Sequence, residues 1–198
     1  MIHSIQIESF SNLLAKSSNS NKKIANNSIA VISLEGNIEK ENGSFNNFSI
    51  SRESVVAKLE KVRKINNLRA IVLRINSPGG SALESELIYK ELMTFKKEYN
   101  IPIYVSMGSV AASGGYYIAS ASNKIFANNS TLTGSIGVVS LIPKFVNTVE
   151  KLNLSAQTIS KGKFAGIYNP YYALTDEDRQ HIYNVSLNVY DEFKNRVK

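Results

Sequence analysis

The sequence predicts an α/β fold whose strands run mostly parallel. Two observations support this class: short apolar runs typical of buried strands recur along the chain, and segments with apolar residues at helical spacing separate them. Alternation of this kind favours a parallel sheet, because each helix carries the chain back to the start of the next strand. The chain has 198 residues, 43% of them hydrophobic and 20% charged, which suits one globular domain with a tail.

The elements follow in order from residue 29. Apolar runs predict strands at 29–34, 70–75, 103–105, 124–127, 133–139 and 156–160. Helical spacing of apolar residues predicts helices at 51–65, 81–99, 145–152 and 175–197. The last of these begins Thr-Asp-Glu-Asp, which suits a helix N-terminus because acidic side chains complement the helix dipole there.

The first 28 residues differ from the rest of the chain. A short amphipathic piece is followed by a polar run rich in Ser, Asn and Lys, which predicts a flexible N-terminal helix and linker over 1–28. A contact with a partner or a second copy is the alternative role for this segment. A single domain is expected over 29–198.

Composition excludes several classes of function. The chain has no cysteine, which excludes disulfides and thiolate catalysis, and it has only two histidines, so neither a metal nor a cofactor is expected. The net charge is +7, but the basic residues are scattered, and nucleic-acid binding is therefore not expected. No apolar run reaches 18 residues and no secretory signal is present, so the chain as written is expected to be soluble.

A serine among small residues follows the strand expected at 103–105. The segment 107–119 suggests a loop that turns into a helix of small residues, with Ser113 between alanines and glycines. In α/β sheets the chemistry gathers at the carboxyl ends of strands. Small neighbours let a substrate approach the Ser113 hydroxyl. Gly114 and Gly80 are candidate donors of backbone N–H groups to the oxyanion of an acyl transfer.

The same residues allow other interpretations. Pro-Gly-Gly after a strand is commonly a turn, Ser-Gly-Gly at the start of a helix suits tight helix packing, and such loops also cradle phosphates. The sequence contains neither a P-loop signature nor a G-x-G-x-x-G run after a strand. Residue types alone therefore leave catalysis, turn structure and phosphate binding open.

Three motifs resemble the signal peptide peptidase (protease IV) type of serine peptidases, a group that also includes phage capsid-maturation proteases. They are RINSPGG at 74–80, AASGGYYIA at 111–119 and TGSIGV at 133–138, and the resemblance covers about residues 29–198. It implies a crotonase/Clp-protease-like fold and a Ser–Lys dyad in which Ser113 is the nucleophile.

The resemblance also implies roles for the residues around Ser113. The backbone N–H groups of Gly80 and Gly114 would bind the oxyanion, and the Ser135 hydroxyl would orient the activating lysine. Three further residues are expected beside the substrate: Gly79, Ser81 and Ile136.

The activating lysine is the one part of this pattern that the sequence lacks. In the family it lies in a Ser-x-Gly-x-x-Lys segment followed by proline, and the matching segment 160–170 carries Ala165 at the lysine position. Lys163 would be displaced by about 6.6–7 Å in an extended chain, beyond hydrogen-bond reach of the serine unless the loop slips. Three explanations for Ala165 stay open: an engineered replacement of lysine, a natural pseudoenzyme and a misplaced alignment.

The resemblance predicts a serine endopeptidase that hydrolyses extended peptides such as released signal peptides or membrane-associated remnants, with this chain an inactivated form. Alternatives are a non-catalytic peptide-binding pseudoenzyme, a phage-type capsid maturation protease and an acyl-CoA enzyme of the crotonase type. Family members assemble as rings, so a homo-oligomer is expected. Membrane association through a segment absent from this chain is also expected, with a cytoplasmic location as the alternative.

Overall fold

The structure is a computed structural model that describes residues 3–7, 27–41 and 49–198. The chain divides into two compact units. The first comprises Met1–Ile136 together with Phe193–Lys198, and the second comprises Gly137–Glu192. The sequence predicted one domain over 29–198 and contained no sign of this division.

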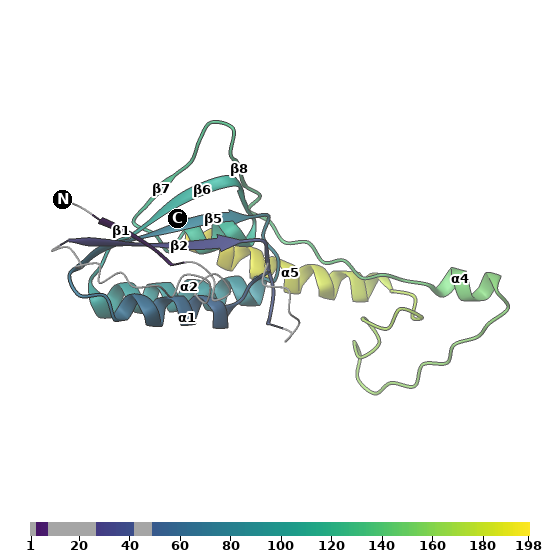
Figure 1. Cartoon of the computed structure of the whole chain (residues 1–198). Helices are drawn as coiled ribbons and strands as arrows, with labels where there is room; N and C mark the ends of the chain where they lie inside the picture. Colours follow the sequence, from purple (N-terminus) through teal and green to yellow (C-terminus); the bar gives the residue numbers. More distant parts are fainter. Residues whose placement is uncertain (1–2, 8–26, 42–48) are drawn as a thin grey trace. The chain divides into compact units, whose positions relative to one another are not determined.

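A parallel sheet forms the body of the first unit (Figure 1). Its strand order is β1-β2-β5-β6-β7, with β8 also paired to β6, and every pair is parallel. The strands are β1 (His3–Ile7), β2 (Ser28–Glu35), β5 (Leu68–Ser77), β6 (Ile103–Ala112), β7 (Lys124–Phe126) and β8 (Leu132–Gly134). The short strands β3 (Asn37–Ile38) and β4 (Ser49–Ile50) pair separately, also in parallel. The predicted α/β class with parallel strands is confirmed.

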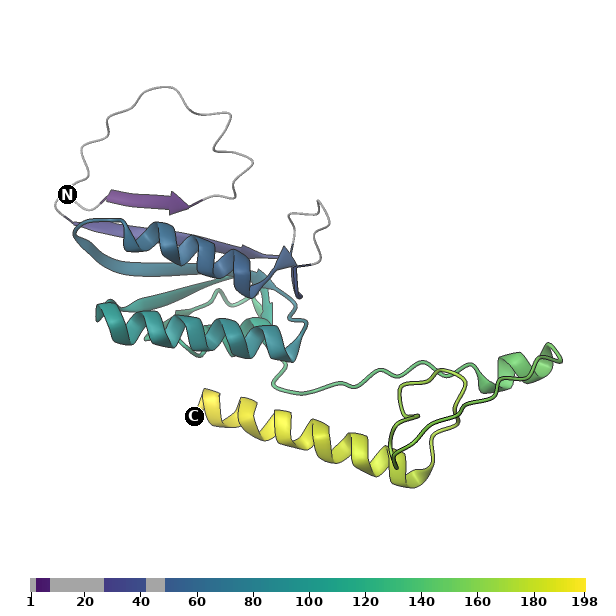
Figure 2. The same cartoon turned by 90° about the horizontal axis from the view of Figure 1, so that it is seen from below.

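Helices α1 (Arg52–Arg63) and α2 (Ala82–Tyr99) lie on the same face of this sheet (Figure 2). The strand order steps in one direction from β2 to β6, and right-handed crossovers therefore place both connecting helices on one side. Both helices begin where the sequence predicted. Ser51 caps α1 through a reciprocal pair of hydrogen bonds with Ser54, and Ser81 caps α2 by accepting the Glu84 N–H.

The core lies between the sheet and these two helices. On β2, every second side chain is buried, and on α1 and α2 the buried positions recur at helical spacing. The fully buried side chains of largest volume are Phe95, Ile32, Leu34, Ile38, Ile71, Leu73, Ile75, Ile88, Leu92, Ile103, Met107 and Ile118. This core fixes the carboxyl ends of β5 and β6 relative to each other.

The expectation for the N-terminus is wrong where the structure tests it. His3–Ile7 is not helical but forms β1, an edge strand paired in parallel with β2. Pairing with a distant strand decided this conformation, and no local pattern reports such pairing. Residues 8–26, the remainder of the expected helix and linker, lie outside the described residues.

Three expectations further along the chain also need correction. The strand expected at 103–105 continues to Ala112, so the residues expected to form a loop from 107 extend the sheet instead. The strand expected at 133–139 ends at Gly134, and 156–160 forms no strand. In 156–160 the side chains are exposed, and strand-forming residue types without a neighbouring strand do not hold a strand.

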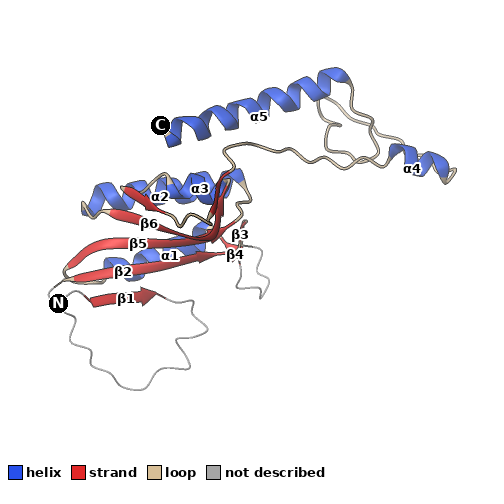
Figure 3. Ribbon diagram, turned by 90° about the horizontal axis from the view of Figure 1, so that it is seen from above, coloured by secondary structure: helices blue, strands red, loops and turns tan. Residues whose placement is uncertain are grey.

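The second unit contains α4 (Val146–Lys151) and most of α5 (Asp176–Val197), joined by a long segment without strands (Figure 3). Hydrogen bonds from Lys144, two residues before α4, hold this segment beside the start of that helix. The Lys144 ammonium donates to the carbonyls of Ile167 and Asn169, at 2.6 and 2.8 Å. Few side chains of this unit are buried, and three apolar ones are at least nine-tenths exposed: Val139, Leu141 and Ile159.

Candidate active site

Ser113 lies at the turn between β6 and α3 (Gly114–Ala119), in a backbone conformation that a serine rarely adopts. Its φ is 51° and its ψ is −121°. Two hydrogen bonds hold it there: its N–H donates to the Gly134 carbonyl and its carbonyl accepts the Tyr117 N–H, both at 2.9 Å. Strain of this kind persists only where the surroundings over-determine it, and nucleophilic serines of other hydrolases sit on comparable strand-to-helix turns.

Gly79 packs directly against this turn. A Cβ placed on Gly79 would meet the Gly114 nitrogen and the Ser113 Cβ at 2.8 Å each, and the φ of Gly79 is +107°. Only glycine combines that conformation with so close an approach. The Pro-Gly-Gly loop after β5 and the Ser-Gly-Gly turn after β6 therefore touch, as expected for an acyl-transfer site at the carboxyl edge of a sheet.

The backbone N–H of Gly80 points away from Ile38, the residue that pairs with it. The flanking groups bind Ile38: the Gly79 carbonyl accepts the Ile38 N–H at 2.9 Å, and the Ser81 N–H donates to the Ile38 carbonyl at 2.7 Å. Backbone groups alternate sides along an extended chain, so the Gly80 N–H points away from Ile38. Gly80 is exposed, and its N–H donates to no acceptor within the described residues.

Gly114 presents a second backbone N–H beside it. As the first residue of α3, its N–H has no partner within the helix. Gly114 is buried, and a Cβ there would lie 2.4 Å from the Ser85 Oγ and 3.1 Å from the Ile38 Cδ1. The two predicted oxyanion donors thus come from adjoining turns. Gly79 links them, because it precedes Gly80 in the sequence and contacts Gly114 in space.

The third motif reaches the same place through β8. Gly134 is in register with Ala112, so Ser135 follows directly after the residue whose carbonyl binds Ser113. Ser135 has a φ of 50° and an exposed side chain, and Ile136 is half-buried. The structure therefore gathers the residues that the sequence singled out in the first unit: Gly79, Gly80, Ser81, Ser113, Gly114, Ser135 and Ile136.

Ala165 belongs to the second unit. It is exposed and lies in a run of turns, where its N–H donates to the Gly162 carbonyl at 3.3 Å. Lys163 forms an ion pair with Glu177 and lies 5.5 Å from the centre of the Phe164 ring. With 63% of its side chain exposed, Lys163 has the environment of a surface lysine rather than of a desolvated base.

Burial lowers the pKa of one lysine in the first unit, Lys58 on α1. A lysine base needs such desolvation, but the Lys58 ammonium donates to the Ser33 carbonyl at 2.7 Å. The Ser113 hydroxyl has no hydrogen bond to a described residue of its own unit. Ser113 therefore lacks an activating base among those residues.

Several residues that shape this site were missed from the sequence. Ile38 binds the glycine loop through its backbone, Ser85 supports Gly114, and Asn76 contacts the backbone of β6. Asn76 and Ser85 lie in or close to the RINSPGG motif, but Ile38 carries no local signal because its role is a backbone contact.

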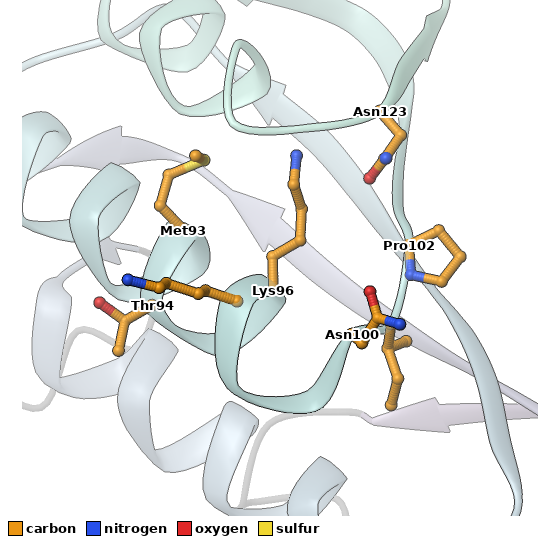
Figure 4. A pocket seen from close by; sticks show the side chains of 8 residues that line it. Met93, Thr94, Lys96, Asn100, Pro102 and Asn123 are labelled. Atoms are coloured by element: carbon orange, nitrogen blue, oxygen red, sulfur yellow. The ribbon is translucent and has the colours of Figure 1, made fainter.

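A pocket of about 560 Å³ lies elsewhere in the first unit (Figure 4). It is lined by Met93, Thr94, Lys96, Lys97, Asn100, Ile101, Pro102 and Asn123. These residues lie near the end of α2 and in the segments just before β6 and β7, whereas Ser113 follows the carboxyl end of β6. The Lys96 ammonium is bound to the Ala121 carbonyl at 2.9 Å. The pocket contains none of the predicted site residues.

In the described ranges, no three His, Asp or Glu side chains group as a metal site requires. None of the helices described is long and apolar enough to cross a bilayer.

Two family models match the sequence. The sequence model of Peptidase family S49 matches residues 95–198, and that of Clp protease matches residues 16–133. A solved structure of a mutant membrane-bound stomatin-specific protease aligns with 61% of this chain and 51% of that chain, at 21% identity and a TM-score of 0.43.

Three relatives show the extent of the sequence similarity. Protease 4 of Haemophilus influenzae is 39% identical, covering 70% of this chain and 22% of that protein. A putative signal peptide peptidase SppA of Enterococcus faecium is 35% identical, covering 90% and 51%. The chloroplastic serine protease SPPA of Arabidopsis thaliana is 41% identical, covering 69% and 20%. The chain thus spans about half, or less, of the length of these relatives.

The two family models together cover every strand of the sheet except β1, the Ser113 turn and the second unit. The chain therefore belongs to peptidase family S49, a family of serine peptidases, and contains a Clp-protease-like domain.

Proposed function

We propose that this fold is built for endoproteolysis by a Ser–Lys dyad, with Ser113 as nucleophile and position 165 as the place of the lysine. The chain as written carries alanine there and is an inactivated form that retains its peptide site. The observation that carries the proposal is the contact of Gly79 with Ser113 and Gly114. It places beside the serine the backbone N–H groups of Gly80 and Gly114, which donate to no acceptor among the described residues.

The chemistry follows from these groups. The Ser113 Oγ attacks the peptide carbonyl and gives its proton to a neutral lysine amine, while the new C–O⁻ accepts hydrogen bonds from the N–H groups of Gly80 and Gly114. The lysine returns that proton to the leaving amine as the C–N bond breaks. Water, deprotonated by the same amine, then releases the acyl group from Ser113.

The substrate proposed is an extended peptide, such as a released signal peptide or a membrane-associated remnant. Gly79, Ser81 and Ile136 line the approach to Ser113 in this proposal, and Ser135 orients the lysine. The proposal includes homo-oligomers and membrane association through a further segment. It includes neither a nucleic acid nor a cofactor.

Restoring the amine tests the proposal. Ala165→Lys is expected to raise kcat/KM for a fluorogenic peptide by about 10²–10⁴-fold, the usual contribution of a general base. The rate should rise with pH as the amine loses its proton, since only the neutral amine accepts the serine proton. Cleavage of a panel of unstructured peptides, followed by mass spectrometry, measures the effect and the cut positions.

Matched variants separate the dyad from other causes. Ala165→Met supplies a chain of similar length without an amine and should stay inactive, and Ser113→Ala should abolish the activity gained by Ala165→Lys. Lys163→Met in the Ala165→Lys background should leave activity unchanged. A well-folded Ala165→Lys protein without cleavage, or cleavage lost with Lys163, would contradict the assignment of position 165.

The non-catalytic peptide-binding alternative has an observation in its favour: Lys163, the nearest lysine to position 165, is engaged with Glu177. This alternative predicts that the chain as written binds the same peptides that the Ala165→Lys variant cleaves. Fluorescence anisotropy of labelled peptides on the unaltered chain tests it, with Ser113→Trp, which obstructs the site, as the control.

A further inference from the structure

Strand β6, which ends just before Ser113, is interrupted by a large β-bulge. Ile75 of β5 pairs with Met107 of β6, but Ser77 pairs with Ala111, so the single residue Asn76 faces the three residues 108–110. Extra residues of this kind bend a strand and increase its twist, and they recur next to active sites. The bulge ends just before Ser113 and therefore sets the direction in which the chain reaches it.

Asn76 holds this bulge from the neighbouring strand. Its Oδ1 accepts the Val110 N–H at 3.2 Å. Gly108 leaves it the necessary space, because a Cβ on Gly108 would lie 2.7–2.9 Å from the Oδ1, Cβ and Cγ of Asn76. The Asn76 side chain thus binds the bulge through its Oδ1, and Gly108 leaves room for that side chain because it has none of its own.

Other side chains bind the carbonyls on either side of the bulge. Arg74 donates to the Met107 carbonyl at 2.6 Å, and Thr131 donates to the Gly108 carbonyl at 2.9 Å. Thr133 donates to the Ala111 carbonyl at 2.8 Å. Polar groups from β5 and from the β7–β8 segment therefore fix the bulge from both neighbours.

We infer that Asn76 is a positioning residue for Ser113, acting through the bulge at 108–110. The inference rests on the proposed role of Ser113 as nucleophile. The bulge brings Ala112 into register with Gly134, whose carbonyl then accepts the Ser113 N–H and holds its strained φ. Loss of the Asn76 acceptor releases the Val110 N–H and lets the bulge relax, which turns the Ser113 hydroxyl away from the Gly80 and Gly114 N–H groups.

The test compares Asn76→Leu, which has similar size and no acceptor, with Asn76→Asp, which retains one. Amide hydrogen exchange by NMR, on the chain as written, reports the Ser113 N–H. Asn76→Leu should speed its exchange about tenfold or more, while Asn76→Asp stays near the parent value. The melting temperature should change little because Asn76 is exposed. Unchanged exchange at Ser113 in Asn76→Leu would overturn the inference.

A second test measures the catalytic rate of the proposed nucleophile, Ser113. In the Ala165→Lys background, Asn76→Leu should lower kcat about 10–100-fold, as misplacement of a reacting group by about 1 Å does, with KM nearly unchanged. Asn76→Asp should restore most of the rate. An equal loss in both variants, or a change confined to KM, would count against positioning. Without cleavage by Ala165→Lys itself the proposed function fails, and the exchange measurement still decides the role of Asn76.

If Asn76→Leu does not fold, two variants of Thr131 provide an independent test of the bulge. Thr131→Val removes the donor to the Gly108 carbonyl and Thr131→Ser keeps it. Faster Ser113 exchange in Thr131→Val alone supports control by the bulge, and equal exchange in both variants contradicts it.

Discussion

The site depends on close approach between residues that have no side chain. Gly79 touches the Ser113 turn, and Gly114 lies against Ser85 and Ile38, so the two glycine loops lie in close contact. In the proposed function, the Ser113 hydroxyl is the reactive side chain that the first unit supplies, and backbone N–H groups supply the oxyanion donors. Substitutions that add one methyl group should therefore act on the site more strongly than many polar changes nearby.

Gly114→Ala tests this dependence. The new Cβ would meet the Ser85 Oγ at 2.4 Å, so overpacking should cost about 1–3 kcal/mol of unfolding free energy and, in the Ala165→Lys background, weaken capture of a peptide boronate by Ser113. Ser85→Ala alone should cost about 1 kcal/mol, because it removes the hydrogen bond to the Ser81 carbonyl.

The double variant is the informative control. Ser85→Ala makes room for the new methyl group, so Gly114→Ala should cost less in that background than in the parent chain. Urea denaturation of the four proteins measures this coupling. Strict additivity would show that contact with Ser85 is not what excludes a side chain at Gly114.

At the scale of elements, α5 begins with a network centred on one carboxylate oxygen. Asp178 Oδ2 accepts hydrogen bonds from the Thr175 N–H, the Thr175 hydroxyl and the Tyr172 hydroxyl. The Thr175 N–H, with help from both hydroxyls, lowers the pKa of Asp178 because it stabilises the charged form. The same bond from Tyr172 raises the pKa of its phenol.

This network predicts a pH-dependent stability for the second unit. Because the folded-state pKa of Asp178 is depressed, its contribution is complete above the unfolded-state value of about 3.9 and is lost as pH falls through the lower folded-state pKa. Asp178→Asn should therefore destabilise the protein at pH 7, and the difference from the parent should shrink in strong acid.

Asp176→Asn is the matched control, since it removes the same charge from the same turn at an exposed position. Chemical denaturation followed by circular dichroism across the pH range compares the two. Equal destabilisation by both variants at pH 7 would contradict a specific role for Asp178.

The elements also show how far the sequence was a guide. Helices α1 and α2 were predicted because apolar residues recur along them at helical spacing, which is a local pattern. The meeting of the motifs around Ser113 was predictable because carboxyl ends of parallel strands share one edge. The extension of β6 through its bulge could not be predicted, because it depends on Asn76 of a neighbouring strand. Strand β1 could not be predicted either, because it depends on pairing with β2.

At the scale of the whole molecule, stability is concentrated in the first unit. The hydrophobic core comprises residues between Ala30 and Ala121, whereas Ile167 is the one buried hydrophobic residue described in Gly137–Glu192. Position 165, where the proposed function places the lysine, thus falls in the unit with the smaller core. The family resemblance pointed to position 165, but its environment follows from packing that no motif encodes.

Hydrogen exchange should display this difference. Amides of β2, β5 and β6 should exchange only through global unfolding, because they lie in the centre of the sheet, and those of α4 should exchange through local opening. Exchange mass spectrometry with increasing urea distinguishes the two mechanisms. Protection of α4 equal to that of β5 would contradict the prediction.

The bond between Ser113 and Gly134 has a consequence for synthesis. During synthesis Ser113 leaves the ribosome before Gly134 does, and the strained turn has no carbonyl to hold it during that interval. Folding of parallel sheets waits for such distant partners. Products of aborted translation that end before Gly134 would therefore carry Ser113 without the hydrogen bond that holds its turn.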